Sequence, residues 1–251
     1  MKKLPVLLQL YTVRDKTAVD FIGTLEQVAK LGYEGVEFAG FNDLPAPQMD
    51  KLLRDLGLTS PSAHIGLDAL MGETQSVIDY ACRVGCTHIA IPYLADNDRP
   101  GQPGWEKVLD GIAKFGPLLK AAGITLMYHN HDFEFVKLGD KYALDVLFES
   151  FDADLLKAQI DTYWVKYAGL VPAEYIRKYP GRVPIVHLKD MEDTPERHYT
   201  EVGSGTQDLP AIFAASEAVG AMWYVVEQDA SRIDTIDSAR LSRANLKALG
   251  L

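Results

Sequence analysis

Four side chains that commonly bind metal ions stand at or just beyond the ends of short apolar runs. They are Glu134, Asp161, His187 and Glu227, and they follow one another at intervals of 27, 26 and 40 residues. Such intervals suit repeated units of one strand and one helix. In a closed barrel of parallel strands the carboxyl ends meet at one mouth, so residues distant in sequence can share one ion there. The spacing therefore predicts a metal-dependent active site.

The first of these candidates closes a dense polar stretch, Tyr128-His129-Asn130-His131-Asp132-Phe133-Glu134. Unpaired polar groups cost free energy in a protein core, so this density at a strand end favours a functional role. His129 and His131 share one face of an extended strand, whereas Glu134 lies past the strand and has to fold back to reach an ion. The alternative for each histidine is a hydrogen-bonded core residue.

The other three candidates have structural alternatives as well. Asp161 is a residue type that favours the N-cap of a helix, and a helix-like segment follows it. His187 shares a strand face with Lys189, and a lysine at the end of a buried strand needs an anionic neighbour, either a metal–carboxylate cluster or an anionic substrate. Glu227 follows four apolar residues and is poorly explained as a solvated surface charge. Their shared position at strand ends favours function.

Earlier strands bring further polar residues to the same mouth. Glu37 and His64 each follow an apolar residue near a strand end, and we expect both to contact substrate, with structural roles as the alternative. We expect His129 and Trp164 to contact substrate as well. His88 opens its strand and should lie at the opposite end of the barrel. The stretch Val202-Gly203-Ser204-Gly205 lacks the third glycine of a dinucleotide fingerprint, although its backbone amides could approach a ligand.

Glycines mark the ends of the helices that alternate with the predicted strands. Five helix-like segments end in a glycine that is followed at once by an apolar run, at Gly32, Gly57, Gly85, Gly123 and Gly220. The predicted strands are Leu4 to Leu10, Gly35 to Phe38, Leu58 to His64, His88 to Pro92, Ile124 to His129, Lys157 to Asp161, Val183 to Lys189 and Met222 to Glu227. Predicted helices include Thr17 to Leu31, Trp105 to Ala122, Asp208 to Val219 and Ser231 to Leu249. This alternation predicts an α/β fold, a single (β/α)8 TIM barrel over residues 1–251, with a doubly wound open sheet as the alternative.

Composition narrows the functional classes. The net charge of -10 argues against nucleic-acid binding, which usually needs phosphate-neutralising lysines and arginines. No apolar run approaches the roughly 20 residues that span a bilayer, and Gln9, Arg14 and Asp15 interrupt any secretory h-region. The two cysteines, Cys82 and Cys86, are expected to be buried thiols in a reducing compartment. We therefore expect a cytoplasmic protein with no membrane or nucleic-acid partner, and a homo-oligomer is compatible with the sequence.

The chain resembles the sugar phosphate isomerase/epimerase family, also called the xylose isomerase-like barrel superfamily. The resemblance covers nearly the whole chain. Its most specific parts are the stretch Tyr128 to Glu134, Asp161-Thr162-Tyr163-Trp164, His187-Leu188-Lys189-Asp190, Val202-Gly203-Ser204-Gly205 and Val226-Glu227-Gln228-Asp229. The resemblance implies the xylose isomerase-like TIM barrel fold and a divalent metal site at Glu134, Asp161, His187 and Glu227.

Two departures from the family bear on the substrate. The free-ketose epimerases have a histidine where this chain has Trp164 and an arginine where it has Asp193, which puts ketohexose epimerisation in doubt. The related DNA-repair endonucleases also have a histidine at the position of Trp164. The double-histidine stretch looks more like the inosose dehydratases and 3-keto-glycoside lyases of the superfamily.

The candidate ligands suggest a mechanism. Three carboxylates and one imidazole form an oxygen-rich set that suits Mn²⁺, Mg²⁺ or Co²⁺, with Zn²⁺ also open, and we expect Mn²⁺. A sugar or cyclitol ketone would bind there and lose the neighbouring proton through an enediolate. Glu227 is the expected base, Glu134 or a histidine of the His129 and His131 pair returns the proton, and Lys189 offsets anionic charge.

The sequence leaves several outcomes open. Reprotonation would make the protein an isomerase or epimerase, whereas loss of a β-hydroxyl would make it a lyase or dehydratase. A non-catalytic sugar-binding barrel is a further alternative, with Trp164, Tyr163 and Trp105 stacking on the ligand. A metal-dependent phosphodiesterase would need a basic cluster, for which Arg14, Arg99 and Lys189 are the candidates.

Overall fold

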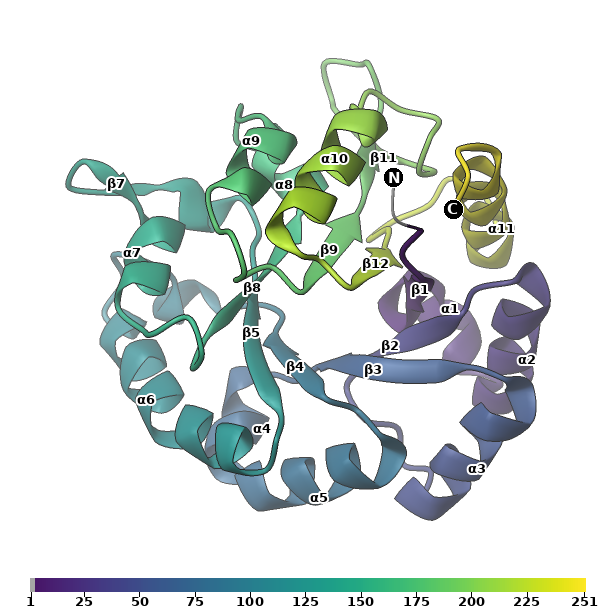
Figure 1. The fold of residues 1–251 in the computed structure, drawn as a ribbon, viewed down its shortest axis with the longest axis horizontal. Coiled ribbons are helices and arrows are strands. Elements are labelled where there is room, and N and C mark those ends of the chain that lie inside the picture. The colour runs from purple at the N-terminus through teal and green to yellow at the C-terminus, as the bar shows by residue number, and fades with distance from the viewer. Residues whose placement is uncertain (1–2) are drawn as a thin grey trace.

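The computed structural model describes residues 3–251, so Met1 and Lys2 of the predicted domain lie outside the described residues. Eight parallel strands close into a barrel in the spatial order β1-β12-β9-β8-β5-β4-β3-β2 (Figure 1). The strands are β1 (Val6–Gln9), β2 (Gly35–Ala39), β3 (Thr59–His64), β4 (His88–Ile91), β5 (Thr125–His129), β8 (Lys157–Asp161), β9 (Ile185–Leu188) and β12 (Trp223–Val226). The predicted closed barrel is confirmed, and the open sheet is wrong.

Helices surround the barrel on the outside (Figure 1). They are α1 (Arg14–Thr17), α2 (Phe21–Leu31), α3 (Ala46–Leu56), α4 (Leu67–Gly72), α5 (Thr74–Val84), α6 (Trp105–Ala121), α7 (Ala143–Glu149), α8 (Thr162–Tyr167), α9 (Pro172–Arg177), α10 (Leu209–Val219) and α11 (Thr235–Ala248). Two short hairpins sit beyond the strand ends, formed by β6 (Lys137–Leu138) with β7 (Lys141–Tyr142) and by β10 (Asp190–Met191) with β11 (Tyr199–Thr200).

The glycines that predicted the helix ends do adopt the left-handed conformation. Gly32, Gly57, Gly85, Gly123 and Gly220 have φ values from 67° to 84°. A residue with a Cβ atom is strained at such φ values, which explains why glycine marks these joints.

Two predicted helices begin later than expected because an aspartate caps each one. The first long helix begins at Phe21 rather than Thr17, since Asp20 accepts a hydrogen bond from the backbone N–H of Gly23. The last begins at Thr235, where Asp234 accepts from the N–H groups of Ile236 and Asp237. A capping side chain satisfies donors that the first helical turn leaves unpaired, so the cap fixes the start.

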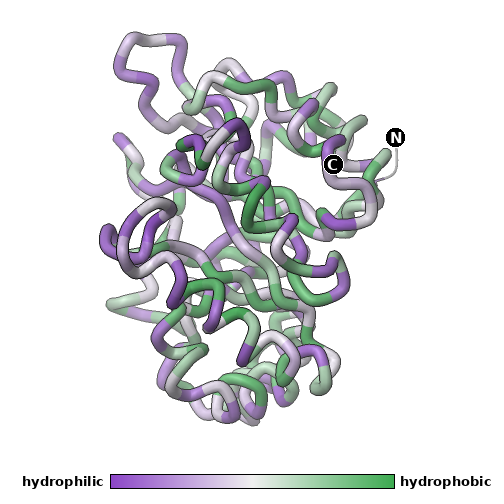
Figure 2. The backbone as a smooth tube through the Cα atoms, turned by 90° about the vertical axis from the view of Figure 1, so that its left-hand side faces the viewer, coloured by the Kyte–Doolittle hydropathy of each residue, from purple (hydrophilic) through white to green (hydrophobic). Residues whose placement is uncertain are grey.

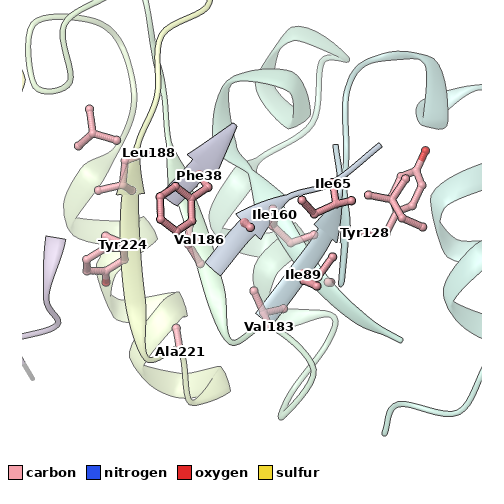
Figure 3. Close-up of a cluster of buried hydrophobic side chains, with 14 of the residues drawn as sticks. Phe38, Ile65, Ile89, Tyr128, Ile160, Val183, Val186, Leu188, Ala221 and Tyr224 are labelled. Carbon is pink, nitrogen blue, oxygen red and sulfur yellow. The ribbon is translucent and has the colours of Figure 1, made fainter. Parts of the chain in front are cut away.

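The outer face of the strands is apolar throughout. Figure 3 shows Phe38, Ile89, Ile160, Val186 and Tyr224 among the side chains of the layer between the barrel and its helices. Figure 2 shows hydrophobic stretches of the chain running through the interior, with hydrophilic segments concentrated in the outer loops. Burial of this layer supplies the main driving force for closing the barrel.

The inner face of the strands divides into two layers. A small apolar cluster fills the lower part of the barrel, formed by Leu7, Ala90, Met127, Ile185 and Val225. His88 lies at this end, as predicted, with its ring 5.2 Å from that of Trp223. Polar side chains fill the upper part, toward the carboxyl ends of the strands.

One prediction about the cysteines is wrong. Cys86 is buried, but Cys82 is exposed on α5. None of the helices within residues 3–251 is long and apolar enough to cross a membrane. A cytoplasmic location and a homo-oligomer stay predictions.

Candidate active site

Strand alternation places the candidate site directly above the apolar layer. Residues two apart on a strand point to the same face, so each inner apolar residue of four strands is followed by an inner polar one. The pairs are Leu7 and Gln9, Met127 and His129, Ile185 and His187, and Val225 and Glu227. The sequence therefore builds a polar layer at the barrel mouth with the same periodicity that builds the core.

Four of these polar side chains form a cluster that could hold a metal ion. His129, Asp161, His187 and Glu227 are buried, and one potential ligand atom from each lies within 4.8 Å of the others. His187 Nδ1 is 3.0 Å from Glu227 Oε2, and His129 Nε2 is 3.7 Å from Asp161 Oδ2. Three of the four predicted metal ligands meet here, with His129 in place of Glu134.

Asp161 has both of the roles that its position suggested. Its Oδ1 atom accepts hydrogen bonds from the N–H groups of Tyr163 and Trp164 and so caps α8. Its Oδ2 atom is buried and has no hydrogen-bond partner, although Lys189 Nζ lies 3.0 Å away as an ion pair. The helix cap thus holds the carboxylate so that its second oxygen remains available to the cluster.

Lys189 provides positive charge beside this oxygen. Its ammonium group is almost fully buried and lies 3.0 Å from Asp161 Oδ2, from Glu227 Oε2 and from Asp229 Oδ1. Burial alone would lower the pKa of Lys189, but these carboxylates raise it well above its ordinary value. The expectation of anionic neighbours for this lysine is confirmed, and three carboxylates supply them.

Protonation in the cluster follows from the same charges. Burial would raise the pKa of Glu227, but the charge of Lys189 and the hydrogen bond with His187 lower it well below its ordinary value. Burial would lower the pKa of His187, but Glu37 and Glu227 outweigh it and raise that pKa to about 10. The contact between Glu227 and His187 thus favours the carboxylate form of the first and the protonated form of the second.

Glu134 does not join the cluster, contrary to the prediction that it binds metal and returns a proton. Its Oε1 atom accepts a hydrogen bond from the hydroxyl of Tyr128, and its Oε2 atom accepts from the N–H of His131. Tyr128 points outward into the apolar layer, where Figure 3 shows it among the other buried side chains of that layer. Glu134 folds back as expected, but toward the outer face of β5, where it fixes the loop that carries His131.

Glu37, which was predicted to contact substrate, lies below the cavity. It is completely buried beneath the histidines, does not line the cavity at the mouth and is surrounded by hydrogen-bond donors. These donors are Gln9 Nε2, Ser62 Oγ, Gln159 Nε2, His187 Nε2 and His64 Nε2. Burial would raise its pKa, but His64 and His187 lower it well below the ordinary value. Glu37 is therefore an ionised carboxylate that contacts the site from below.

A cavity of about 690 Å³ opens above the cluster. Its wall includes three of the four residues predicted to contact substrate, namely His64, His129 and Trp164, and the predicted catalytic residues His131 and Glu227. Aromatic rings of Tyr11, Tyr93 and Phe133 also line it. His131 Nδ1 and the indole nitrogen of Trp164 are buried without hydrogen-bond partners, and their rings lie 5.3 Å apart.

The basic cluster that a phosphodiesterase would need is not formed. Arg14 donates to the backbone oxygens of Tyr11 and Asp229. Arg99 pairs with Asp96 at 2.8 Å and lies over the ring of Phe133. Lys189 is paired with carboxylates, so each of the three cations predicted to bind phosphate already has a partner within the protein.

The glycine-rich stretch has a structural partner instead of a ligand. The N–H groups of Gly203 and Gly205 both donate to Asp190 Oδ2, and the N–H of Gln207 donates to Asp190 Oδ1. A Cβ atom on Gly205 would lie 2.4 Å from Asp190 Oδ1, so no other residue fits there. The suggestion that these amides approach a ligand is wrong, because Asp190 already occupies them.

Comparison with known proteins assigns the family. The family described as the xylose isomerase-like TIM barrel matches residues 25–249. The chain belongs to this family. An inosose dehydratase from Geobacillus kaustophilus is 25% identical over 189 residues, which is 66% of this chain and 61% of that protein. The chain thus matches less than two thirds of the length of this relative.

Two solved structures share the fold of this chain. A sugar phosphate isomerase/epimerase from Parabacteroides distasonis has a TM-score of 0.83 at 22% identity, covering 98% of this chain and 95% of that one. The IOLI protein with a bound zinc atom has a TM-score of 0.76 at 13% identity, covering 98% of both chains. At these identities the likeness concerns the fold alone.

Several polar residues of this xylose isomerase-like barrel belong to the site although the sequence did not predict them. Gln9, Ser62 and Gln159 lie inside the barrel and bind Glu37, and Asp229 pairs with Lys189. The signal for the first three was present in the sequence, because each lies on the same strand face as an inner residue of the site. Asp229 follows Glu227 by two residues and carries the same signal.

Proposed function

We propose that this protein is a divalent-cation-dependent enzyme that removes a proton beside the carbonyl of a sugar or cyclitol ketone. The observation that carries the proposal is the buried group of two imidazoles and two carboxylates, of which His129 and Glu227 line a cavity. Its similarity to inosose dehydratases supports a substrate of this class.

The residues present fit a cation. Asp161 Oδ2 is a buried carboxylate oxygen that forms no hydrogen bond and pairs with the ammonium of Lys189, so it can also serve as a ligand of a bound cation. His129, Asp161, His187 and Glu227 would hold the ion, which when bound would supply Lewis-acid stabilisation of negative charge on the substrate oxygens. Two imidazoles in the set suit Zn²⁺ as well as the Mn²⁺ expected from the sequence.

The protein's own groups would handle the proton. Glu227 is an ionised carboxylate that lines the cavity, which makes it the base we propose. His131 lies on the loop after β5 and also lines the cavity, where its unpaired Nδ1 atom can exchange a hydrogen bond with a substrate hydroxyl. Lys189 holds Glu227 and Asp161 in place and offsets their negative charge.

The cavity favours a neutral substrate. Aromatic rings of Tyr93, Phe133 and Trp164 provide apolar surface for the C–H faces of a sugar ring. Arg99 is the cation of the wall, and Asp96 already pairs with it. A phosphorylated sugar would find a single arginine or lysine, Arg99, among the side chains that line the described cavity, and Asp96 competes for it.

Dehydration is the second candidate outcome. The same proton abstraction leads to loss of a β-hydroxyl instead of reprotonation, and similarity to inosose dehydratases favours it. Trp164 and Asp193, which stand where the free-ketose epimerases have a histidine and an arginine, also favour dehydration over epimerisation.

Deuterium exchange tests the proposal. The protein, loaded in turn with Mn²⁺ and Zn²⁺, is incubated in heavy water with ketoses, inososes and 3-keto-glycosides. We expect cation-dependent deuterium uptake beside the carbonyl, with an unsaturated product if the outcome is dehydration. Absence of both uptake and product over the whole panel would contradict the proposal, and unchanged ligand affinity after chelation would support a non-catalytic sugar-binding barrel instead.

A further inference from the structure

Glu37 lies where it can control the imidazoles of the candidate site. Its carboxylate is completely buried, and it lies 150 residues before His187 in the chain. Its Oε1 atom is 2.7 Å from His187 Nε2 and 2.7 Å from Gln9 Nε2. Its Oε2 atom accepts from Ser62 Oγ and Gln159 Nε2, both at 2.6 Å. A carboxylate so placed cannot reach substrate, so any role in the reaction passes through its neighbours.

The contact with His187 decides which ring nitrogen is free. Both oxygens of Glu37 already accept hydrogen bonds, Oε1 from Gln9 Nε2 and Oε2 from Ser62 Oγ. The ring nitrogen of His187 that faces Oε1 therefore carries the proton. When His187 is neutral, this leaves the lone pair on Nδ1, the atom that lies 3.0 Å from Glu227 Oε2. The lone pair therefore points into the candidate metal cluster.

A second path runs from Glu37 through Gln159 to His129. Because Glu37 accepts at Oε2, the amide nitrogen of Gln159 must face it, and the amide oxygen then faces the histidines. That oxygen lies 3.1 Å from His129 Nδ1, which must carry the proton. The lone pair of His129 is left on Nε2, the atom nearest Asp161 and Glu227 in the cluster.

We infer that Glu37 is the positioning residue that fixes the tautomers of both imidazole ligands, through direct contact with His187 and through the Gln159 amide with His129. The inference rests on the proposed function, since it assumes that these imidazoles bind a cation. Hydrogen bonds from a buried partner to the distal ring nitrogen orient a ligand and raise its basicity.

An amide at this position cannot reproduce the arrangement. The side chain of Glu37→Gln has one acceptor arm and one donor arm, whereas both arms of Glu37 accept. If the donor arm faces His187, the proton moves to Nδ1 and blocks that ligand atom. If the donor arm faces Gln159, that amide must turn and present its own N–H groups to His129. In either orientation, one of the two imidazoles loses the tautomer that leaves its metal-binding nitrogen free.

Nuclear magnetic resonance of the unaltered protein tests the tautomers directly. With ¹⁵N-labelled histidine and bound Zn²⁺, we expect long-range ¹H–¹⁵N correlations to show the proton of His187 on Nε2 and that of His129 on Nδ1. A proton on Nδ1 of His187 or on Nε2 of His129 would overturn the inference. This measurement needs no variant and so does not depend on the folding of one.

Metal affinity provides the second test. By calorimetric titration with Zn²⁺ and with Mn²⁺, we expect Glu37→Gln to bind on the order of 10- to 100-fold more weakly than the unaltered protein. Gln159→Met, which removes only the path to His129, should show a smaller loss and serves if Glu37→Gln fails to fold. Unchanged affinity in a folded Glu37→Gln protein would overturn the role of Glu37.

Asp145→Asn is the matched control. Asp145 is a buried carboxylate on α7 that accepts hydrogen bonds from Tyr175 and Lys178, remote from the cluster. We expect this change to lower stability while leaving Zn²⁺ affinity and both tautomers unchanged; an equal loss of affinity would show that the Glu37 effect is merely structural. Failure of the unaltered protein to bind either ion would instead refute the proposed function.

Discussion

The two layers inside the barrel differ in chemistry although the same strands build both. The lower layer consists of Leu7, Ala90, Met127, Ile185 and Val225, which pack without polar atoms. The upper layer consists of Gln9, Glu37, Ser62, His64, His129, Gln159, Asp161, His187 and Glu227, which are buried and joined by hydrogen bonds and ion pairs. A step of two residues along a strand separates a layer suited to stability from one suited to chemistry.

This difference explains how the barrel tolerates so many buried charges. Glu37, Asp161 and Glu227 would each be costly alone in a low-dielectric interior. Lys189 and the imidazoles supply compensating charge and donors, and the apolar layer beneath excludes water from that side. We therefore expect changes in the upper layer to affect chemistry, and changes in the lower layer to affect folding.

The largest expected effect lies in the upper layer. Glu227→Gln should reduce deuterium uptake from heavy water into substrate by roughly 10²- to 10⁴-fold, because the proposed base is lost. Circular dichroism should show an unchanged fold. Undiminished exchange would remove Glu227 from the role of base.

The lower layer should respond in the opposite way. Met127→Ala should lower the free energy of unfolding by about 2–5 kcal/mol, because it leaves a cavity in the buried apolar cluster. Denaturant titration measures this loss, and Zn²⁺ affinity measured on the folded variant should stay the same. A marked loss of affinity would show that the two layers are not separable.

A pH-dependent effect is expected outside both layers, at Glu134. Burial raises the pKa of this carboxyl from 4.5 to about 8, so the folded protein keeps a proton that the unfolded chain releases above its ordinary pKa. Stability should therefore fall as pH rises from about 4.5 to 8, by at most about 1.4 kcal/mol per pH unit. Glu134→Gln should flatten this slope without changing Zn²⁺ affinity, and an unchanged slope would contradict the assignment.

The architecture could be predicted because its signals are local. Glycines at the helix ends and short apolar runs each report on a few neighbouring residues, and they marked the eight strands of the closed barrel. Asp161, His187 and Glu227 could be predicted as a group because strand ends converge at one mouth whatever the details of the loops.

The remaining contacts depend on geometry that no short stretch of sequence contains. Glu134 and His129 lie in one motif, and only the path of the loop after β5 decides that Glu134 turns toward Tyr128 while His129 joins the cluster. The role of Glu37 depends on His187 and Gln159, which are 150 and 122 residues away. The position of Glu37 on its strand predicted that the side chain faces the barrel interior, but it did not predict that the side chain lies below the cavity.

Anomalous X-ray diffraction at the zinc edge, on crystals of the Zn²⁺-loaded protein, tests the central claim most directly. We predict one ion bound by His129 Nε2, Asp161 Oδ2, His187 Nδ1 and Glu227 Oε2, at distances of about 2.0–2.2 Å. An ion bound elsewhere, or no anomalous peak among these four side chains, would contradict the account.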